Sequence, residues 1–362
     1  MEFKKLEEEG VNFYIAEDVF YNPHMGLSRT LSSLFIGVLD EKLNIIDGMA
    51  ASGIRGMRYK KENRNVENVA FVDVYEKATE CIRKGTRVNK IKAKIFKDDI
   101  NRFLFNSTDE CNFVELDPFG TPTPYIYFAV RALRNLKYGY VSVTATDTAV
   151  LCGAHKKACL KNYHSKPMRN HFCHETGLRI LINYIARISH EFNFGINPLL
   201  SFYYRHQMKT IIKLEKGAKK ADENLKSIGW INFCEKCLNT TSGELENFCS
   251  LCKNKNRNAG DLWLGKINDK EIINKMLALN KKRKYKNQEE TEKFLNLLYE
   301  EVKVPWFYDT HEVAKKYRIQ SPKIEKLIKM LKKKGFQASR THFCPTGFKT
   351  DANIKKIIPC LG

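Results

Sequence analysis

The sequence predicts an α/β fold with a mainly parallel sheet, because short apolar strands alternate with helical segments along the first half of the chain. Four of these strands end in an acidic residue, in the order Asp47, Asp73, Asp99 and Asp117. The carboxyl ends of parallel strands meet at one edge of a sheet, so we expect the four acids to face a single ligand crevice. Taken one at a time, each Asp also fits a helix N-cap, which is a frequent use of Asp after a strand.

Composition agrees with a globular protein of about two domains, since the 362 residues are 43% hydrophobic and 28% charged. No apolar run has the length of a membrane helix, and the N-terminus lacks the apolar core of a secretory signal, so we expect a cytoplasmic protein. The net charge of +21 indicates a polyanionic partner, with nucleic acid the first candidate and a general lysine bias the alternative. Nothing in the sequence indicates an obligate protein partner.

The first strand, residues 43–47, leads into a turn of small residues, Gly48-Met-Ala-Ala-Ser-Gly-Ile-Arg-Gly56, and then a helix. Small residues let the backbone approach a ligand closely at a helix N-terminus. Before this strand, residues 27–38 have helical spacing of apolar residues and contain Arg29, which by local context alone is an ordinary solvated arginine.

The second strand, residues 69–73, ends in an acid about two dozen residues after the glycine turn, as expected for a carboxylate that receives two ribose hydroxyls. A helix at 77–89 separates it from a strand at 93–96. Asp98, Asp99 and Ile100 follow that strand, and there an acid and an apolar side chain could hold an adenine ring.

The next strand runs into Asp117-Pro-Phe-Gly-Thr-Pro122, which we interpret as a catalytic loop. The amine of a nucleobase is a poor nucleophile, and the Asp117 carboxylate and the Pro118 carbonyl could accept hydrogen bonds that draw it out of conjugation. Phe119 could stack on a base that has left its helix. An ordinary strand-to-helix turn is the alternative, since Asp and Pro are common turn residues.

Farther along, residues 139–147 form a fifth strand, and residues 198–214 form two strands that turn at 205–207 and close the sheet on an antiparallel edge. A helix is expected at 180–188. We interpret the basic segment 152–168 as a loop that acts as a lid or contacts RNA. The nearby histidines do not suggest a metal or catalytic set; these are His155, His164, His171 and His174.

Four cysteines have the spacing of a metal-binding ribbon at about residues 230–257: Cys234, Cys237, Cys249 and Cys252. Two Cys-x-x-Cys pairs separated by a hydrophilic stretch typically give four thiolates to one tetrahedral Zn²⁺, which would be structural because no coordination position stays open. A chance pairing of free cysteines is the alternative. The other cysteines are interpreted as small buried apolar residues: Cys81, Cys111, Cys152, Cys159, Cys173, Cys344 and Cys360.

The last hundred residues hold the basic excess, with 23 Lys and Arg against 11 Asp and Glu between Trp263 and Gly362. We interpret Lys281–Lys284 as a loop. Helices at 310–317 and 322–334, followed by a strand at 336–342, predict a winged-helix-like module that grips nucleic-acid phosphates. A solvated basic helix is the alternative.

Three motifs together closely resemble the tRNA guanine-N2 dimethyltransferase family that modifies guanosine 26: Ala51-Ser-Gly-Ile-Arg-Gly-Met-Arg-Tyr59, Asp117-Pro-Phe-Gly-Thr-Pro122 and Ser339-Arg-Thr-His-Phe-Cys-Pro-Thr-Gly-Phe-Lys-Thr-Asp351. The resemblance spans nearly the whole chain. It implies a class I methyltransferase (Rossmann-like) domain with a seven-stranded sheet, expected at 1–266 with the zinc ribbon, and a C-terminal tRNA-binding domain, expected at 267–362.

The resemblance also assigns residues. It implies that S-adenosylmethionine is bound by Arg29, Arg58, Asp73, Asp99 and Ile100, and that Phe20, Asp117 and Phe119 form the pocket for the target guanine; Asp47 joins the cofactor set from its place at a strand end. Two alternatives stay open. One is an amino-methyltransferase that acts on another RNA or DNA base, although the loop has Phe119 where DNA enzymes have a second proline. The other is a non-catalytic zinc-containing nucleic-acid-binding protein.

Overall fold

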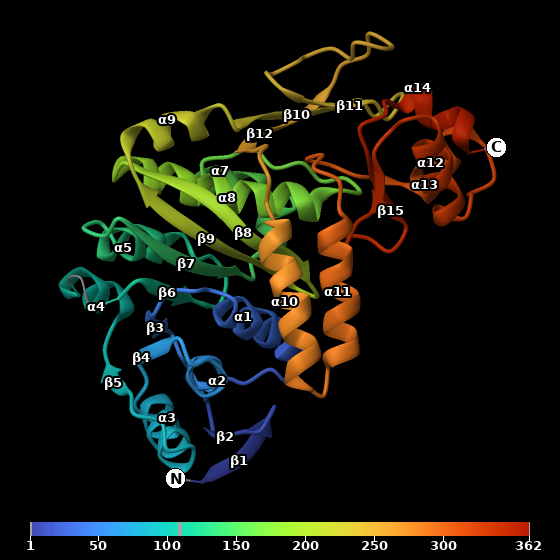
Figure 1. The fold of residues 1–362 in the computed structure, drawn as a ribbon. Helices are drawn as coiled ribbons and strands as arrows, with labels where there is room; N and C mark the ends of the chain where they lie inside the picture. Colours follow the sequence, from blue (N-terminus) through green and yellow to red (C-terminus); the bar gives the residue numbers. More distant parts are fainter. Residues whose placement is uncertain (1, 108–110, 362) are drawn as a thin grey trace.

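The computed structural model describes residues 2–107 and 111–361 and is organised around one seven-stranded sheet with helices on both faces (Figure 1). The strands of this sheet are β3 (Leu43–Gly48), β4 (Val66–Asp73), β5 (Lys94–Lys97), β6 (Phe113–Leu116), β7 (Tyr138–Ala145), β8 (Phe194–Tyr204) and β9 (Gln207–Lys216). Their order is β5-β4-β3-β6-β7-β9-β8. The first five are parallel, and β9 runs antiparallel to both β7 and β8. The predicted hairpin is confirmed, with β9 inside the sheet and β8 at its edge.

The two faces of the sheet bury two different sets of residues, because successive side chains of a strand point to opposite faces. Ile45 and Phe113 belong to one core cluster, whereas their neighbours Ile46 and Val114 belong to the other. The first face is covered by α1 (Gly26–Gly37), α2 (Ile54–Glu62), α3 (Glu76–Val88), α10 (Lys270–Arg283) and α11 (Gln288–Glu300). The second is covered by α4 (Ile100–Asn106), α5 (Thr123–Ala132) and α8 (Cys173–Glu191).

Residues 267–300 pack against the sheet domain. Ile273 and Met276 of α10 and Leu295 of α11 lie in the same cluster as Leu31 of α1, and Figure 1 shows the two helices side by side next to α1. The expectation of a loop at Lys281–Lys284 is wrong, since α10 continues to Arg283 and Lys284 caps it. Basic residues are favourable in the last turn of a helix because they face its negative end.

The basic segment 152–168 is also partly helical. It contains α7 (Lys156–Tyr163), which follows the short α6 (Thr148–Leu151), so the expected loop is corrected over these residues. Cys159 and Tyr163 are its buried side, and lysines lie on its outer side. The helix α9 (Ala218–Leu225) connects the sheet to the ribbon.

The ribbon is a three-stranded antiparallel sheet of β10 (Ile228–Phe233), β11 (Thr240–Gly243) and β12 (Arg257–Trp263). The C-terminal module contains β13 (Tyr308–Asp309), α12 (Thr310–Tyr317), α13 (Ile324–Lys333), β14 (Ala338–Arg340), β15 (Gly347–Thr350) and α14 (Ile354–Ile357). In it β15 lies between β13 and β14. A helix-turn-helix followed by a two-stranded wing confirms the winged-helix-like prediction. Ribbon and module lie together at the end of the molecule far from the N-terminus (Figure 1).

An N-terminal hairpin completes the fold. It consists of β1 (Phe3–Glu8) and β2 (Val11–Ala16), which the sequence analysis did not predict. Val11 and Phe13 are buried against α3 and α2. Within residues 2–107 and 111–361, no helix combines the length and apolar character needed to span a bilayer.

Candidate active site

A cavity of about 630 Å³ lies at the carboxyl ends of the parallel strands. All the predicted cofactor and catalytic residues except Arg58 line it, and these are Phe20, Arg29, Asp47, Asp73, Asp99, Ile100, Asp117, Pro118 and Phe119. Residues scattered over a hundred positions of sequence therefore meet in one place. The volume lies within the range of roughly 300–1,000 Å³ that is usual for small-molecule sites.

The acids at the ends of β4 and β5 have structural partners as well as a place in the cavity wall. Asp73 accepts the backbone N–H of Ala51 at 2.8 Å and that of Tyr75 at 2.9 Å. Asp99 caps α4 by accepting the backbone N–H of Arg102 at 3.0 Å, as the alternative interpretation of a strand-end Asp expects. None of these three bonds takes its residue out of the cavity wall, because Asp73 and Asp99 both line it.

The small-residue turn after β3 follows the wall of the cavity. Met49, Ala51 and Gly53 have φ values of 57°, 47° and 71°, so the chain reverses tightly before α2 begins. A side chain at Gly48 would lie 2.8 Å from the Cδ1 atom of Ile100. The absence of a side chain at Gly48 thus lets Ile100 pack against the strand end.

The Asp117 loop is fixed to the end of β7. Gly120, with φ of +78°, donates its N–H to the hydroxyl of Thr146 at 2.7 Å, and the Thr146 N–H returns a bond to the Gly120 carbonyl at 3.0 Å. The Thr121 hydroxyl contacts Tyr163 of α7, whose own hydroxyl donates to Asp147. Segment 152–168 therefore supports the loop from behind.

Two aromatic rings stand at the mouth of the cavity. Phe20 and Phe119 are 52% and 76% exposed, and their rings meet edge to face with centroids 4.7 Å apart. Exposed aromatic rings beside a hydrogen-bond acceptor suit a flipped base. In this arrangement the rings touch one another, so a base enters between them only if Phe20 or Phe119 moves aside.

A buried charge network lies directly under Asp117. Arg55 donates to Asp117 Oδ2 at 2.6 Å and lies 3.8 Å from Glu115, which in turn pairs with Lys209. Glu115 and Lys209 are fully buried. Burial raises the pKa of the Asp117 carboxyl, but the charges of Arg55 and Lys209 outweigh this and keep the pKa below its usual value. Asp117 is therefore an ionised, acceptor-only group at neutral pH.

Asp47 behaves in the opposite way. It is 2% exposed and accepts the backbone N–H of Gly56 at 2.9 Å. Burial, and then the negative charge of Glu115, raise its pKa to about 7, against the attraction of Arg55. Two acids on adjacent strands thus differ in protonation because their neighbours differ.

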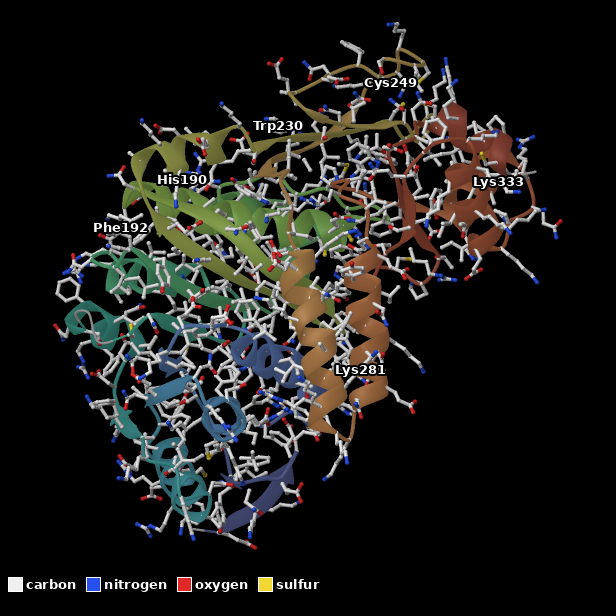
Figure 2. The ribbon with its side chains drawn as sticks, in the orientation of Figure 1. His190, Phe192, Trp230, Cys249, Lys281 and Lys333 are labelled. Atoms are coloured by element: carbon white, nitrogen blue, oxygen red, sulfur yellow. The ribbon has the colours of Figure 1, made fainter. Side chains whose placement is uncertain are left out.

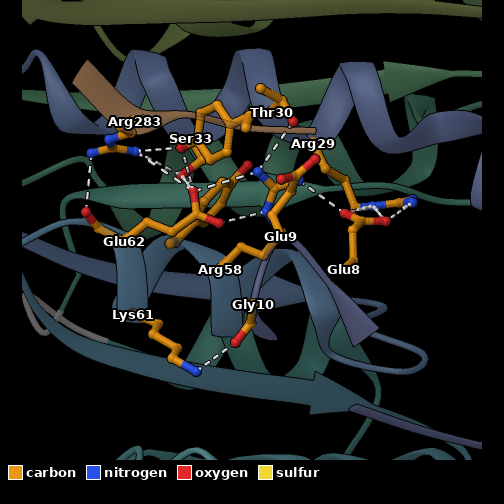
Figure 3. A network of polar contacts seen from close by, with 12 residues as sticks. Glu8, Glu9, Gly10, Arg29, Thr30, Ser33, Arg58, Lys61, Glu62 and Arg283 are labelled. Atoms are coloured by element: carbon orange, nitrogen blue, oxygen red, sulfur yellow. Dashed lines mark hydrogen bonds and ion pairs between the residues drawn. The ribbon is translucent and has the colours of Figure 1, made fainter. Parts of the chain in front are cut away.

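Arg29 and Arg58 belong to one network of ionic contacts between the N-terminal hairpin, α1 and α2 (Figure 3). Arg29 pairs with Glu8 and has its guanidinium 5.1 Å from the Tyr21 ring. Arg58 donates to Glu8 Oε1 at 2.9 Å and to Glu62 Oε1 at 2.6 Å, and its side chain is fully buried. Arg29 reaches the cavity, whereas Arg58 is not among the lining residues. The predicted contact of Arg58 with a cofactor stays a prediction.

Sequence reasoning missed the charged residues that surround this site: Glu8, Arg55, Glu115 and Lys209. Glu115 and Lys209 did carry a signal, since a charged residue inside an apolar strand must find a partner. Arg55 was quoted within a motif but given no role. Glu8 lies in a run of exposed-looking acids and offered no signal at all.

The four ribbon cysteines come together as predicted. Their sulfur atoms all lie within 4.8 Å of one another, with Cys234 and Cys252 at 3.4 Å and Cys237 and Cys249 at 3.6 Å. The C-terminal module contacts the ribbon, because the Tyr317 hydroxyl donates to the Cys237 carbonyl at 2.8 Å.

A second cavity, of about 520 Å³, lies where the ribbon and the module meet. Most of its charged lining residues are basic: Arg169, Arg257, Lys315, Lys316 and Arg318 stand against Glu235 and Glu312. Figure 2 shows the ribbon with Cys249 and the module with Lys333 at this end of the molecule, and Lys281 on α10. Basic side chains of different elements thus face one hollow.

A sheet of this order, with a glycine-containing first turn and acids at successive strand ends, has the architecture of the class I methyltransferase fold. The comparisons agree. The chain belongs to the N2,N2-dimethylguanosine tRNA methyltransferase family, whose model matches residues 2–361. Trm1 of Pyrococcus horikoshii, solved with S-adenosyl-L-methionine, has a TM-score of 0.90 and 32% identity, with 99% of each chain covered.

Curated relatives agree over nearly the full length. The tRNA (guanine(26)-N(2))-dimethyltransferase of Methanobrevibacter smithii is 39% identical over 350 residues, which is 94% of this chain and 90% of the relative. The enzyme of the same name from Pyrococcus furiosus is 38% identical over 351 residues, 92% of this chain and 90% of the relative. The family resemblance is confirmed, and the two alternatives are not favoured.

Proposed function

We propose that this chain transfers methyl groups from S-adenosylmethionine to the exocyclic N2 of guanosine 26 of tRNA and forms N2,N2-dimethylguanosine. The observation that carries the proposal is the position of Asp117, an ionised acceptor in the wall of the cavity beside two exposed aromatic rings. Family membership supplies the reaction and the base.

The residues of the cavity fit the cofactor. Asp73 at the end of β4 would receive the ribose hydroxyls, and Asp99 with Ile100 would hold the adenine. Gly48 and Gly53 keep the turn close to the wall, where a bulkier chain would collide with Ile100 or Ile82. S-adenosylmethionine, when bound, supplies a methyl group on a positively charged sulfur.

Asp117 and Pro118 would bind the amine of the target guanine. Hydrogen bonds from the guanine N2 amine to the Asp117 carboxylate and the Pro118 carbonyl would draw the nitrogen lone pair out of conjugation. Phe119 and Phe20 would hold the ring in one plane, which makes positioning the main source of rate enhancement. Arg55 keeps Asp117 both ionised and oriented, so it is a positioning residue.

Arg29 and Arg58 would act together at the other wall. Arg29 lines the cavity, and its guanidinium is held by Glu8. Arg58 holds the same Glu8 from behind at 2.9 Å. Arg58 would therefore influence the cofactor through Glu8 and Arg29 rather than by direct contact.

The ribbon would hold one structural Zn²⁺. Tetrahedral geometry at a Zn–S distance of about 2.3 Å places sulfur atoms about 3.8 Å apart, close to the separations observed here. Residues 267–362 would carry the tRNA-binding part, with the basic hollow between ribbon and module receiving backbone phosphates.

The test is transfer of labelled methyl to a tRNA transcript and to its G26→A variant, followed by digestion to nucleosides. We expect N2,N2-dimethylguanosine from the first and no label from the second. Label in neither transcript, with cofactor binding intact, would overturn the substrate assignment.

The mechanism has its own test. Asp117→Ala should abolish transfer while cofactor binding persists, whereas Asp40→Ala, at an acid whose side chain is 94% exposed, should leave the rate unchanged. Methyl transfer by Asp117→Ala at the wild-type rate would exclude the proposed role of the carboxylate.

A further inference from the structure

A second group of metal-ligating side chains lies outside the ribbon. Cys152 follows α6, while Cys173 and His174 are the first two residues of α8. The two sulfur atoms and one imidazole nitrogen of this group lie within 4.8 Å of one another. The sequence analysis gave these cysteines an apolar role and placed His174 in no metal set, whereas in the structure the three side chains lie together.

We propose that Cys152, Cys173 and His174 bind a second Zn²⁺, distinct from that of the ribbon. Two thiolates and an imidazole form a soft donor set that suits zinc. Ideal tetrahedral coordination asks for donor separations of about 3.5–3.8 Å at normal Zn–S and Zn–N distances, so only small side-chain movements are required. Three protein ligands leave the fourth position to water.

The ligands are held in place before any metal arrives. The Cys152 N–H bonds to the Thr148 carbonyl at 2.8 Å, and the Cys173 N–H bonds to the Asn170 carbonyl at 3.3 Å. The His174 ring stacks on Tyr203 of β8 with centroids 4.0 Å apart and an interplanar angle of 18°. Ring stacking fixes the plane of the imidazole, which lowers the entropic cost of coordination.

The position of Cys152, Cys173 and His174 indicates a structural role for the metal. α6 begins just after Thr146, which holds the Asp117 loop through two hydrogen bonds. Tyr203 lies near the end of β8, close to two residues that line the cavity, His206 and Gln207. A metal at this point would tie the C-terminal end of α6 to the start of α8, whose His174 stacks on Tyr203 of β8. It would therefore stiffen the support of the catalytic loop without touching substrate.

The experiment counts zinc in the full-length chain. The protein is stripped with a chelator under reducing conditions, reloaded with Zn²⁺, desalted and analysed by elemental mass spectrometry. We expect two zinc ions per wild-type chain and one in each of Cys152→Ser, Cys173→Ser and His174→Gln. His155→Gln, at an exposed histidine of the same segment, and Cys159→Ala are the matched controls and should keep two.

Two further measurements make the result unambiguous. Cys234→Ser should lose the ribbon zinc and retain the second, and Co²⁺ loading of that variant should give the visible spectrum of a two-thiolate site. If a cysteine variant fails to fold, as judged by circular dichroism, His174→Gln decides alone. One zinc ion per wild-type chain, or two per His174→Gln chain, would overturn the proposal. A disulfide between Cys152 and Cys173 that survives reduction and excludes the metal would also overturn it.

Discussion

Arg55 offers the sharpest test of how the site is built, because it bears the positive charge nearest to Asp117. The perturbation is Arg55→Met, which keeps an unbranched apolar stem and removes the charged guanidinium group. Glu115 and Asp117 then keep Lys209 as their cationic neighbour. Arg55 is 8% exposed, its Asp117 contact is 2.6 Å and its Glu115 contact is 3.8 Å.

The magnitude follows from these distances. Two unit charges 4 Å apart interact by about 4 kcal/mol at an effective dielectric constant of 20, and removal of one partner from a buried pair typically costs about 3–5 kcal/mol. Asp117 is 31% exposed, so its share is reduced by solvent, whereas Glu115 has no exposure and carries most of the loss. We expect Arg55→Met to lower the free energy of unfolding by about 3 kcal/mol or more.

The assay is urea unfolding followed by circular dichroism, for Arg55→Met, Asp117→Asn and the double variant. Because the two residues are in contact, the double variant should be more stable than the sum of the single effects predicts. Arg83→Met, at a pair with both side chains nearly half exposed, is the control and should change the free energy by less than about 1 kcal/mol. A loss in Arg55→Met no larger than in this control, or strict additivity, would refute the reasoning.

Three further predictions concern pH, assembly and salt. Asp47 has a folded-state pKa raised to about 7, so its protonated form contributes stability that is complete below about pH 4 and lost as pH rises through 7. Asp47→Asn should therefore raise the melting temperature above pH 7 and leave it unchanged near pH 4. A change in melting temperature that is the same at every pH would contradict the raised pKa. Lys349→Met should lower the free energy of unfolding in urea by about 1.5–3 kcal/mol, because buried Glu175 loses the ammonium group 2.6 Å away and retains Arg179, which lies 3.0 Å from the same carboxylate oxygen. A loss of less than about 1 kcal/mol, as for an exposed pair, would contradict this contribution. Replacing both Lys315 and Lys316 by Gln should make tRNA affinity less steeply dependent on salt, by about one unit of logarithmic slope for each phosphate that is no longer neutralised. Lys219→Gln on α9 is the control and should leave this slope unchanged. Equal slopes for the wild type and the double variant would exclude the basic hollow as a phosphate-binding site.

The parallel half of the sheet could be predicted from sequence because its signals are local. Each strand is a short apolar run that ends in an acid, and the helices between them have their own periodicity. Asp73, Asp99 and Asp117 lie in the crevice for that reason alone. The hairpin of β1 and β2 was missed because alternating charged and apolar residues such as Lys5 and Leu6 resemble a solvated, charged N-terminus.

The charge network could not be predicted, since it depends on which strands become neighbours. Glu115 and Lys209 are 94 residues apart, and they meet because β7 and β9 pair in an antiparallel register that brings Lys209 opposite Thr144. No local pattern encodes that pairing. The same holds for Cys152 and His174, which meet only because α6 and α8 pack together.

The C-terminal motif Ser339–Asp351 shows how a distant segment is joined to the site. His342 accepts the Tyr203 N–H at its Nε2, at 3.2 Å, so its Nδ1 must carry the proton that bonds to Glu301 at 2.7 Å. Lys349 of the same motif reaches Glu175 on α8. Both contacts anchor the winged-helix-like module to β8 and α8, which also carry Tyr203 and two of the proposed metal ligands, Cys173 and His174. We therefore interpret this motif as a docking element, which fixes the position of the C-terminal module relative to the cavity at the strand ends.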